Sequence, residues 1–217
     1  NQLSTLHKVR NFDVVVLDDN SPDKTADIVD SMNFPWVSVL RRPVKAGLGA
    51  AYRAGFAHVL PMGKYSQVVT MDADGSHQVS DLINMMEWIG SSDVLIGSRW
   101  IQDGSITNWN RAREYLSRSA NRYAKVMLGL KVKDVTSGFR IYETALLKKM
   151  DLSTIKSEGY CFQIEMVRRA VASGGSVAEI PINFVERTHG QSKMSVAIAV
   201  EAVFRITWWA LLRIIGR

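Results

Sequence analysis

Four short apolar runs, separated by segments of helical periodicity, limit the folds that this chain can adopt. The runs read FDVVVL (12–17), WVSVL (36–40), QVVTM (67–71) and DVLIGS (93–98). Each has the length and β-branched content of a buried strand. The intervening segments with helical patterns are residues 45–60, 79–89 and 112–128. This alternation predicts an α/β fold with a largely parallel sheet flanked by helices.

Charged or polar residues follow each predicted strand. They are Asp18 and Asp19, Arg41 and Arg42, Asp72 and Asp74, and Ser98 and Arg99. In open α/β sheets, ligands bind beyond the carboxyl ends of the strands. A single aspartate after a strand is commonly a helix cap, but four such strand ends at one edge indicate a ligand site.

The bulk properties leave several partners open. The 217 residues suffice for a sizeable core, and the net charge of +6 favours nucleic acid, nucleotide phosphates or an acidic membrane surface without choosing among them. Cys161 is the only cysteine, which excludes an intrachain disulfide and favours a reducing compartment. Because no linker is evident, we expect one catalytic domain over residues 1–193, followed by a separate helix over 194–217.

The stretch MDADGSH places two carboxylates, Asp72 and Asp74, one residue apart after a strand. Such a pair is relieved by a cation, and Mg²⁺ or Mn²⁺ binds carboxylates together with the oxygens of a substrate diphosphate. An aspartate-rich turn that caps the next helix is the plain alternative. A calcium loop fails because Ile83 stands where it needs a bidentate glutamate. A phosphatase-like role, with Asp72 as nucleophile, is weaker because the other acidic pair precedes it in the chain.

Seven segments in order resemble one enzyme family. They are VVVLDDNSPDKTADIV, GLGAAYRAGF, MDADGSH, IGSRW, DVTSGFRIY, GYCFQIEM and PINFVERTHGQSKMS. Together they resemble family-2 glycosyltransferases of the GT-A (Rossmann-like) fold, and most closely the bacterial single-domain polyprenol (dolichol) phosphate mannose synthases. The resemblance covers about residues 12–195. It implies an inverting transfer of mannose from GDP-mannose to a polyprenyl phosphate at the cytoplasmic face of a membrane, with no nucleic acid as partner.

The resemblance also implies roles for particular residues. Asp72, Ala73 and Asp74 would contact the donor diphosphate, and Asp18 and Asp19 would lie at the nucleoside. The same comparison implies a divalent metal, Mg²⁺ or Mn²⁺, held by Asp72 and Asp74. Ser76 is a weaker candidate for that metal, because related enzymes of the archaeal type often carry glutamine there.

Basic residues are expected to meet the acceptor phosphate. Arg99, after the fourth strand, is the best candidate at the reaction centre, because its planar guanidinium binds phosphate oxygens bidentately. The further candidates are Arg111, Arg113, Ser137, Arg140, Arg187, Ser192 and Lys193. A structural pairing of Arg140 with Glu165, and a merely solvated loop at 187–193, are the alternatives.

A phosphate nucleophile explains why the sequence offers no compelling general base. Its second pKa is about 6, so it is mostly ionised at neutral pH. The developing charge on the leaving diphosphate is stabilised by a metal and by arginines. His77 is accordingly interpreted as a loop residue, not as a base.

Residues 194–217 predict an amphipathic helix. Glu201, Arg205, Arg213 and Arg217 drift along one stripe, and Trp208 and Trp209 lie in the apolar part. The longest uncharged run, residues 206–212, is far shorter than the ~20 residues that span a bilayer. This predicts a helix in the membrane interface, with a core helix as the alternative. We expect a peripheral, monotopic protein.

Two alternative functions are open, and the chain differs from the family's pattern at its N-terminus. The same motifs occur in enzymes that make polyprenyl phosphoglucose from UDP-glucose, and a catalytically silent, membrane-bound nucleotide-binding module is possible. The resemblance also implies a strand before Phe12 that ends in a Pro-x-Tyr-Asn-Glu-like motif, which nothing in residues 1–11 matches. We therefore expect that sequence preceded Asn1.

Overall fold

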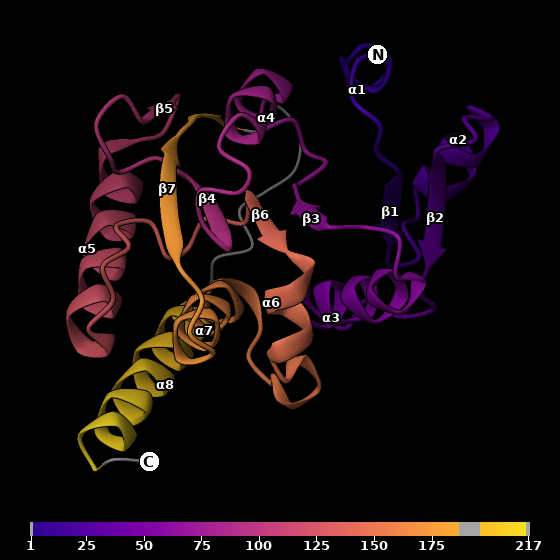
Figure 1. The fold of residues 1–217 in the computed structure, drawn as a ribbon. Helices are drawn as coiled ribbons and strands as arrows, with labels where there is room; N and C mark the ends of the chain where they lie inside the picture. Colours follow the sequence, from indigo (N-terminus) through magenta and orange to yellow (C-terminus); the bar gives the residue numbers. More distant parts are fainter. Residues whose placement is uncertain (1, 187–195, 216–217) are drawn as a thin grey trace. The chain divides into compact units, whose positions relative to one another are not determined.

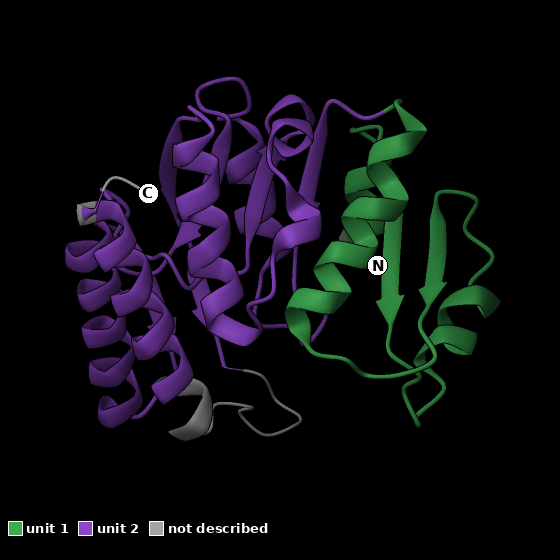
Figure 2. Ribbon diagram, turned by 90° about the horizontal axis from the view of Figure 1, so that it is seen from below, with its two compact units in different colours: residues 1–64 green, residues 65–217 purple. Residues whose placement is uncertain are grey.

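A computed structural model describes residues 2–186 and 196–215. The chain divides into two compact units, residues 1–64 and 65–217, which Figure 2 colours separately. The sequence did not predict this division.

The first unit contains two parallel strands and their helices. Its elements are α1 (Gln2–His7), β1 (Val14–Asp18), α2 (Thr25–Ser31), β2 (Val37–Arg41), α3 (Leu48–Val59) and a 3₁₀ turn, η1 (Leu60–Met62). β1 and β2 pair in parallel from Val14 opposite Val37 to Asp18 opposite Arg41. The small-residue helix α3 approaches β1 closely, because a Cβ at Gly55 would lie 3.0 Å from the Leu17 side chain. Both predicted strands of this unit are confirmed.

The second unit is built on a four-stranded sheet in the order β3-β6-β4-β7. Figure 1 shows β4 between β6 and β7. Its elements are β3 (Gln67–Thr70), α4 (Val79–Met86), β4 (Val94–Ser98), β5 (Ser105–Thr107), α5 (Arg111–Leu128), β6 (Arg140–Glu143), α6 (Thr144–Lys149), η2 (Leu152–Thr154), α7 (Gly159–Ala172), β7 (Val177–Pro181), β8 (Asn183–Val185) and α8 (Val196–Ile214). The predicted α/β fold is confirmed.

One strand of this sheet runs against the others. β6 pairs antiparallel with both β3 and β4, whereas β4 and β7 are parallel. β3 and β4 therefore run in the same direction on either side of β6, and both end near Arg140, which lies opposite Thr70 and Ile96. This places the residues after β3 and those after β4 at one edge of the sheet. β4 is buried along its whole length, which explains its continuous apolar run.

The C-terminal helix α8 belongs to the second unit and packs on α5 and α7 (Figure 1). Ile206 and Ala210 are buried, and the hydroxyls of Tyr123 and Thr207 lie 2.7 Å apart. The opposite side carries exposed apolar residues at helical spacing: Val200, Val203, Phe204, Trp208, Leu211 and Ile215. The helix thus packs on the second unit along one side, and the membrane contact of the other side stays a prediction. None of the helices in residues 2–186 and 196–215 is apolar over a length that would cross a membrane.

Candidate functional site

The two aspartates after β3 lie in a tight turn. Asp74 Oδ1 accepts hydrogen bonds from the Ser76 backbone N–H (3.1 Å) and from its hydroxyl (2.5 Å). Gly75 has a φ of +80°, a backbone conformation that residues other than glycine rarely adopt. The Asp72 carboxylate is partly exposed and accepts no hydrogen bond from a residue that the structure describes. The turn therefore holds Asp74 in place and leaves the Asp72 oxygens available to a ligand.

Ser76 differs from its expected place at the metal. It is buried, and its hydroxyl donates to Asp74. Its own carbonyl accepts the Val185 N–H from β8 at 3.2 Å. Ser76 is thus a support for Asp74 and for the turn, and the geometry gives no support to its direct coordination of an ion.

His77 is a site residue that the sequence did not identify. It is buried, stacked on Phe139 with ring centres 4.7 Å apart, and its Nδ1 accepts the Asp72 backbone N–H at 3.0 Å. Burial lowers the pKa of His77 below its usual value, although the nearby Asp72 and Asp74 charges act in the opposite direction. A neutral imidazole with Nδ1 engaged holds the main chain at Asp72. The spacing of five residues gave no sequence signal for this contact.

Arg99 lies in a buried ion pair at the end of β4. Its Nε and Nη2 each lie 2.7 Å from one oxygen of Asp134, and Nη2 also donates to the Thr136 hydroxyl at 2.9 Å. Burial acts to lower the pKa of Arg99, but the Asp134 carboxylate outweighs it and raises this pKa. Burial likewise acts to raise the pKa of Asp134, and Arg99 holds it below its usual value. Both groups therefore stay charged, and the guanidinium is rigidly placed.

One edge of the Arg99 guanidinium is still uncommitted. Nη1 forms no hydrogen bond with the part of the chain that the structure describes. The guanidinium carbon lies between 5.3 and 5.5 Å from three aromatic ring centres, those of Phe184, Trp100 and Trp109. The Arg99 edge bearing Nη1 is thus the part of this side chain that an anion could reach.

Arg113 lies against the same group of aromatic rings as Arg99. We call this group, Phe184, Trp100 and Trp109, the aromatic wall. Its guanidinium stacks on Trp109 at 4.0 Å and forms an ion pair with Glu186. Its backbone N–H donates to the Asn110 side chain, which caps α5. Arg111, at the first position of α5, is exposed and forms no ion pair or hydrogen bond with a described residue. Of these two acceptor candidates, Arg113 is held near Arg99 and Arg111 is left to solvent.

Arg140 is wholly buried and serves the main chain. Its Nε donates to the Ser137 carbonyl (2.8 Å), Nη2 to the Val135 carbonyl (2.8 Å), and Nη1 to the Gln163 carbonyl (3.0 Å). Its side chain is 0% exposed, so no phosphate reaches it in this conformation. Glu165 pairs with Arg169 at 2.7 Å, so the alternative that paired Arg140 with Glu165 is wrong.

Ser137, like Arg140, is buried and contacts the main chain. Its hydroxyl lies 3.4 Å from the Phe139 backbone nitrogen. Glu179 of β7 accepts the backbone N–H groups of Lys133 and Asp134 at the other end of the same loop. Residues 133–140 therefore form a loop fixed by buried charges, and the DVTSGFR motif gains a structural explanation.

The remaining candidates lie elsewhere. In the first unit, Asp18 is buried at the end of β1, and Asp19 forms an ion pair with Arg42 at 2.8 Å. Ala73 is exposed between the two aspartates of the second unit. Arg187, Ser192 and Lys193 lie outside the described residues. The structure thus brings together Asp72, Asp74, His77, Arg99 and Arg113 within one unit.

Protein side chains alone do not complete a metal site. Within residues 2–186 and 196–215, no group of three or more histidines, cysteines, aspartates and glutamates is placed to hold a metal. Two neighbouring carboxylates suit Mg²⁺ or Mn²⁺ only when substrate oxygens and water supply the other ligands. The hard oxygen donors of Asp72 and Asp74 fit that arrangement.

Solved structures define the class of fold. Mannosyl-3-phosphoglycerate synthase from Rubrobacter xylanophilus superposes with a TM-score of 0.69 over 100% of this chain and 69% of its own, at 16% identity. Glucosyl-3-phosphoglycerate synthase from Mycobacterium tuberculosis, in a complex with Mn²⁺, UDP-glucose and glycerol 3-phosphate, gives 0.52 over 97% of this chain and 82% of its own, also at 16% identity. The chain has the GT-A, Rossmann-like fold.

Sequence relatives define the family. The family model for glycosyl transferase family 2 matches residues 2–151. Polyprenol monophosphomannose synthase of Mycolicibacterium smegmatis is 43% identical, over 94% of this chain and 78% of the relative. Undecaprenyl-phosphate mannosyltransferase of Micrococcus luteus is 45% identical, over 92% of this chain and 82% of the relative. The chain belongs to glycosyltransferase family 2.

Proposed function

We propose that this glycosyltransferase moves mannose from GDP-mannose to a polyprenyl phosphate. The observation that carries the proposal is the identity of 43–45% to two relatives named for polyprenyl phosphate mannose transfer, over more than nine-tenths of the chain. In the reaction, an acceptor phosphate oxygen forms a bond to the anomeric carbon. The bond from that carbon to the diphosphate breaks, GDP leaves, and the configuration inverts.

The donor diphosphate is proposed to bind at the turn after β3. Asp72 and Asp74 would hold Mg²⁺ or Mn²⁺, which when bound neutralises charge on the leaving diphosphate. Ser76 and His77 support this turn: one holds the Asp74 carboxylate, and the other holds the Asp72 main chain. Asp18 and Asp19 are proposed as contacts of the nucleoside.

The acceptor phosphate is proposed to bind at the aromatic wall that holds Arg99 and Arg113. The Nη1 edge of Arg99 is oriented by Asp134 and therefore requires no reorganisation to meet a phosphate oxygen. No base is needed because the acceptor phosphate is already ionised at neutral pH. The neutral, hydrogen-bonded His77 agrees with this, since its Nδ1 is occupied by a backbone donor.

A transfer assay tests this function and its rival. Full-length protein is incubated with radiolabelled GDP-mannose or UDP-glucose and a short polyprenyl phosphate, with Mg²⁺, with Mn²⁺ or with EDTA. We expect lipid-linked product from GDP-mannose with a divalent metal and none with EDTA. Product from UDP-glucose alone would establish the glucosyl alternative, and no product from either donor would refute the enzyme assignment.

The exposed side of α8 is proposed to lie in the membrane interface. Phe204 is 71% exposed and Trp208 is 54% exposed, although both are large apolar residues. Trp209 differs, because it lies under the Arg168 guanidinium at 5.0 Å. An apolar helix face of this kind would keep the enzyme at the membrane surface where its acceptor resides. We propose that the enzyme acts at the cytoplasmic face of that membrane.

Removing apolar area from this face should weaken binding to uncharged vesicles. The change Phe204→Ser with Trp208→Ser should lower the partition coefficient on phosphatidylcholine vesicles by on the order of 100-fold, because two large side chains lose their transfer free energy. The matched control, Ile83→Ser with Trp88→Ser, removes exposed apolar residues outside α8. Flotation of both variants measures the difference, and equal binding would show that α8 is not the anchor.

A further inference from the structure

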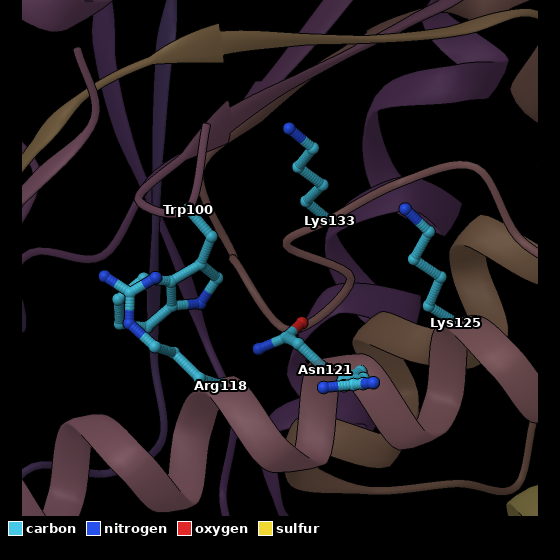
Figure 3. Close-up of a pocket in the computed structure, with 6 residues that line it drawn as sticks. Trp100, Arg118, Asn121, Lys125 and Lys133 are labelled. Carbon is cyan, nitrogen blue, oxygen red and sulfur yellow. The ribbon is translucent and has the colours of Figure 1, made fainter. Parts of the chain in front are cut away.

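A cationic cavity lies against α5 in the second unit, and it contains none of the residues assigned above to donor, metal or acceptor. Its volume is about 160 Å³. Its lining residues, drawn in Figure 3, are Trp100, Arg118, Asn121, Arg122, Lys125 and Lys133. Four of these six are cations and none is a carboxylate. A hollow lined in this way has the charge of an anion-binding site.

The cations gather on one face of α5. Arg118, Arg122 and Lys125 are spaced by four and three residues, so their side chains are neighbours on the helix. Lys133, on the loop after α5, also lines the hollow. Like charges at this spacing destabilise a helix. Their concentration around one hollow is therefore unfavourable unless an anion neutralises it.

Nearby carboxylates neutralise only one of the four cations. Glu114 pairs with Arg118 at 2.8 Å, and Asp134 is taken up by Arg99. Glu179 accepts the backbone N–H of Lys133, not its ammonium group. Within the described residues, no ion pair is formed by Arg122, Lys125 or the Lys133 side chain. Three cations at the hollow thus lack an anionic partner from the part of the chain that the structure describes.

Three of the six lining residues, Trp100, Arg118 and Asn121, are held by contacts within the protein. The Arg118 guanidinium stacks on Trp100 at 4.2 Å, as Figure 3 shows. The Asn121 amide donates to the Ser117 carbonyl (2.9 Å) and to the Thr136 hydroxyl (3.1 Å), which ties the floor to the buried Arg99 network. The Trp100 Nε1–H is buried and has no acceptor among the described residues. The hollow therefore offers oriented donors and few acceptors.

We propose that this cavity binds a phosphate group, carried either by an anionic lipid headgroup or by a free phosphate or pyrophosphate ion. Its volume is below the roughly 300–1,000 Å³ of pockets that take drug-sized ligands, which suits a small anion. Arginine and lysine are the side chains that bind phosphate in proteins. Because α5 also packs on α8, a headgroup bound here would add a charged contact to the membrane contact proposed for α8.

Two binding arms distinguish the sources. The variant Arg122→Gln with Lys125→Gln is compared with the charge-matched control Lys148→Gln with Lys149→Gln, whose exposed lysines lie on α6. One arm measures flotation on vesicles with 20% phosphatidylglycerol, and the other measures calorimetric binding of inorganic phosphate and pyrophosphate, both without sugar donor. If a lipid headgroup is the ligand, the cavity variant should bind anionic vesicles about 30-fold more weakly than the wild type, and the control should change by no more than about 3-fold.

The outcomes separate cleanly. Selective loss of vesicle binding in the cavity variant establishes a lipid source, and selective loss of phosphate or pyrophosphate binding establishes a free anion. Equal binding by cavity variant and control in both arms would overturn the proposal. Lys133→Gln, a single change in an exposed residue, repeats both arms in case the double variant folds poorly. The transfer assay is independent, so its failure would leave this result unaffected.

Discussion

Asp74→Asn should lower sugar transfer by on the order of 10²–10³-fold. The substitution removes one of the two charges that we assign to the metal and the leaving diphosphate, where charge develops in the transition state. The asparagine oxygen can still accept the two hydrogen bonds from Ser76, so the turn should keep its shape. The measurement is the initial rate of lipid-linked product formation at saturating Mg²⁺, together with the thermal midpoint of unfolding.

Two controls identify the cause of that loss. Asp103→Asn makes the same chemical change in an exposed loop residue with a φ of +66°, which asparagine tolerates, and should leave the rate unchanged. Ser76→Ala removes only the hydroxyl's hydrogen bond to Asp74 and should lower the rate about 10–100-fold, as for other residues that orient metal ligands. An Asp74→Asn enzyme with a rate within about twofold of the wild type would refute the assignment.

Asp134→Asn should cost about 3–5 kcal/mol in the free energy of unfolding. The change leaves the Arg99 guanidinium buried without its counter-ion, and one-sided removal of a buried ion pair has an effect of this size. Urea denaturation at pH 7 measures it, again with Asp103→Asn as the matched control. A loss below about 1 kcal/mol would show that the pair is not buried as described.

The pH dependence provides a second check on the same pair. Because Arg99 holds the pKa of Asp134 below its usual value, the stabilisation is present above the unfolded pKa of about 3.9. It is lost as the pH falls through the folded pKa. The difference between wild type and Asp134→Asn should therefore be constant near neutral pH and shrink only in acid below about pH 4.

The double variant Arg99→Met with Asp134→Leu separates stability from catalysis. Replacing a buried ion pair with apolar residues of similar volume is often neutral or stabilising. The double variant should therefore recover most of the stability lost in Asp134→Asn. Its transfer rate should stay low, because the guanidinium that we assign to the acceptor phosphate is gone. Recovery of both properties would reduce Arg99 to a purely structural role.

The sequence predicted the strands well and the partners of the site residues poorly. The apolar runs ending before Asp18, Asp72 and Arg99 are strands, because β-branched runs bounded by turn formers have one stable conformation in a buried sheet. The antiparallel strand β6 was not predicted, because the direction of a strand depends on where the chain returns and not on its own residues. The structure does not support phosphate binding by Arg140 or metal coordination by Ser76. The sequence could not show this, because it does not distinguish a polar side chain that faces a ligand from one that binds the backbone.

The sequence by itself determined the family, the α/β class and the carboxylate pair that follows the third apolar run. These features depend on residue type and order along the chain, which are local quantities. Only the tertiary structure decided which polar and charged side chains are paired inside the protein. Asp134, 35 residues away in the chain, binds one edge of the Arg99 guanidinium. His77 accepts the main-chain N–H of Asp72, and Arg140 donates to main-chain carbonyls of the loop at residues 133–140. These pairings result from burial, because a charged group removed from water needs a partner. That partner is the residue that lies nearest in the folded chain, not the one nearest in sequence.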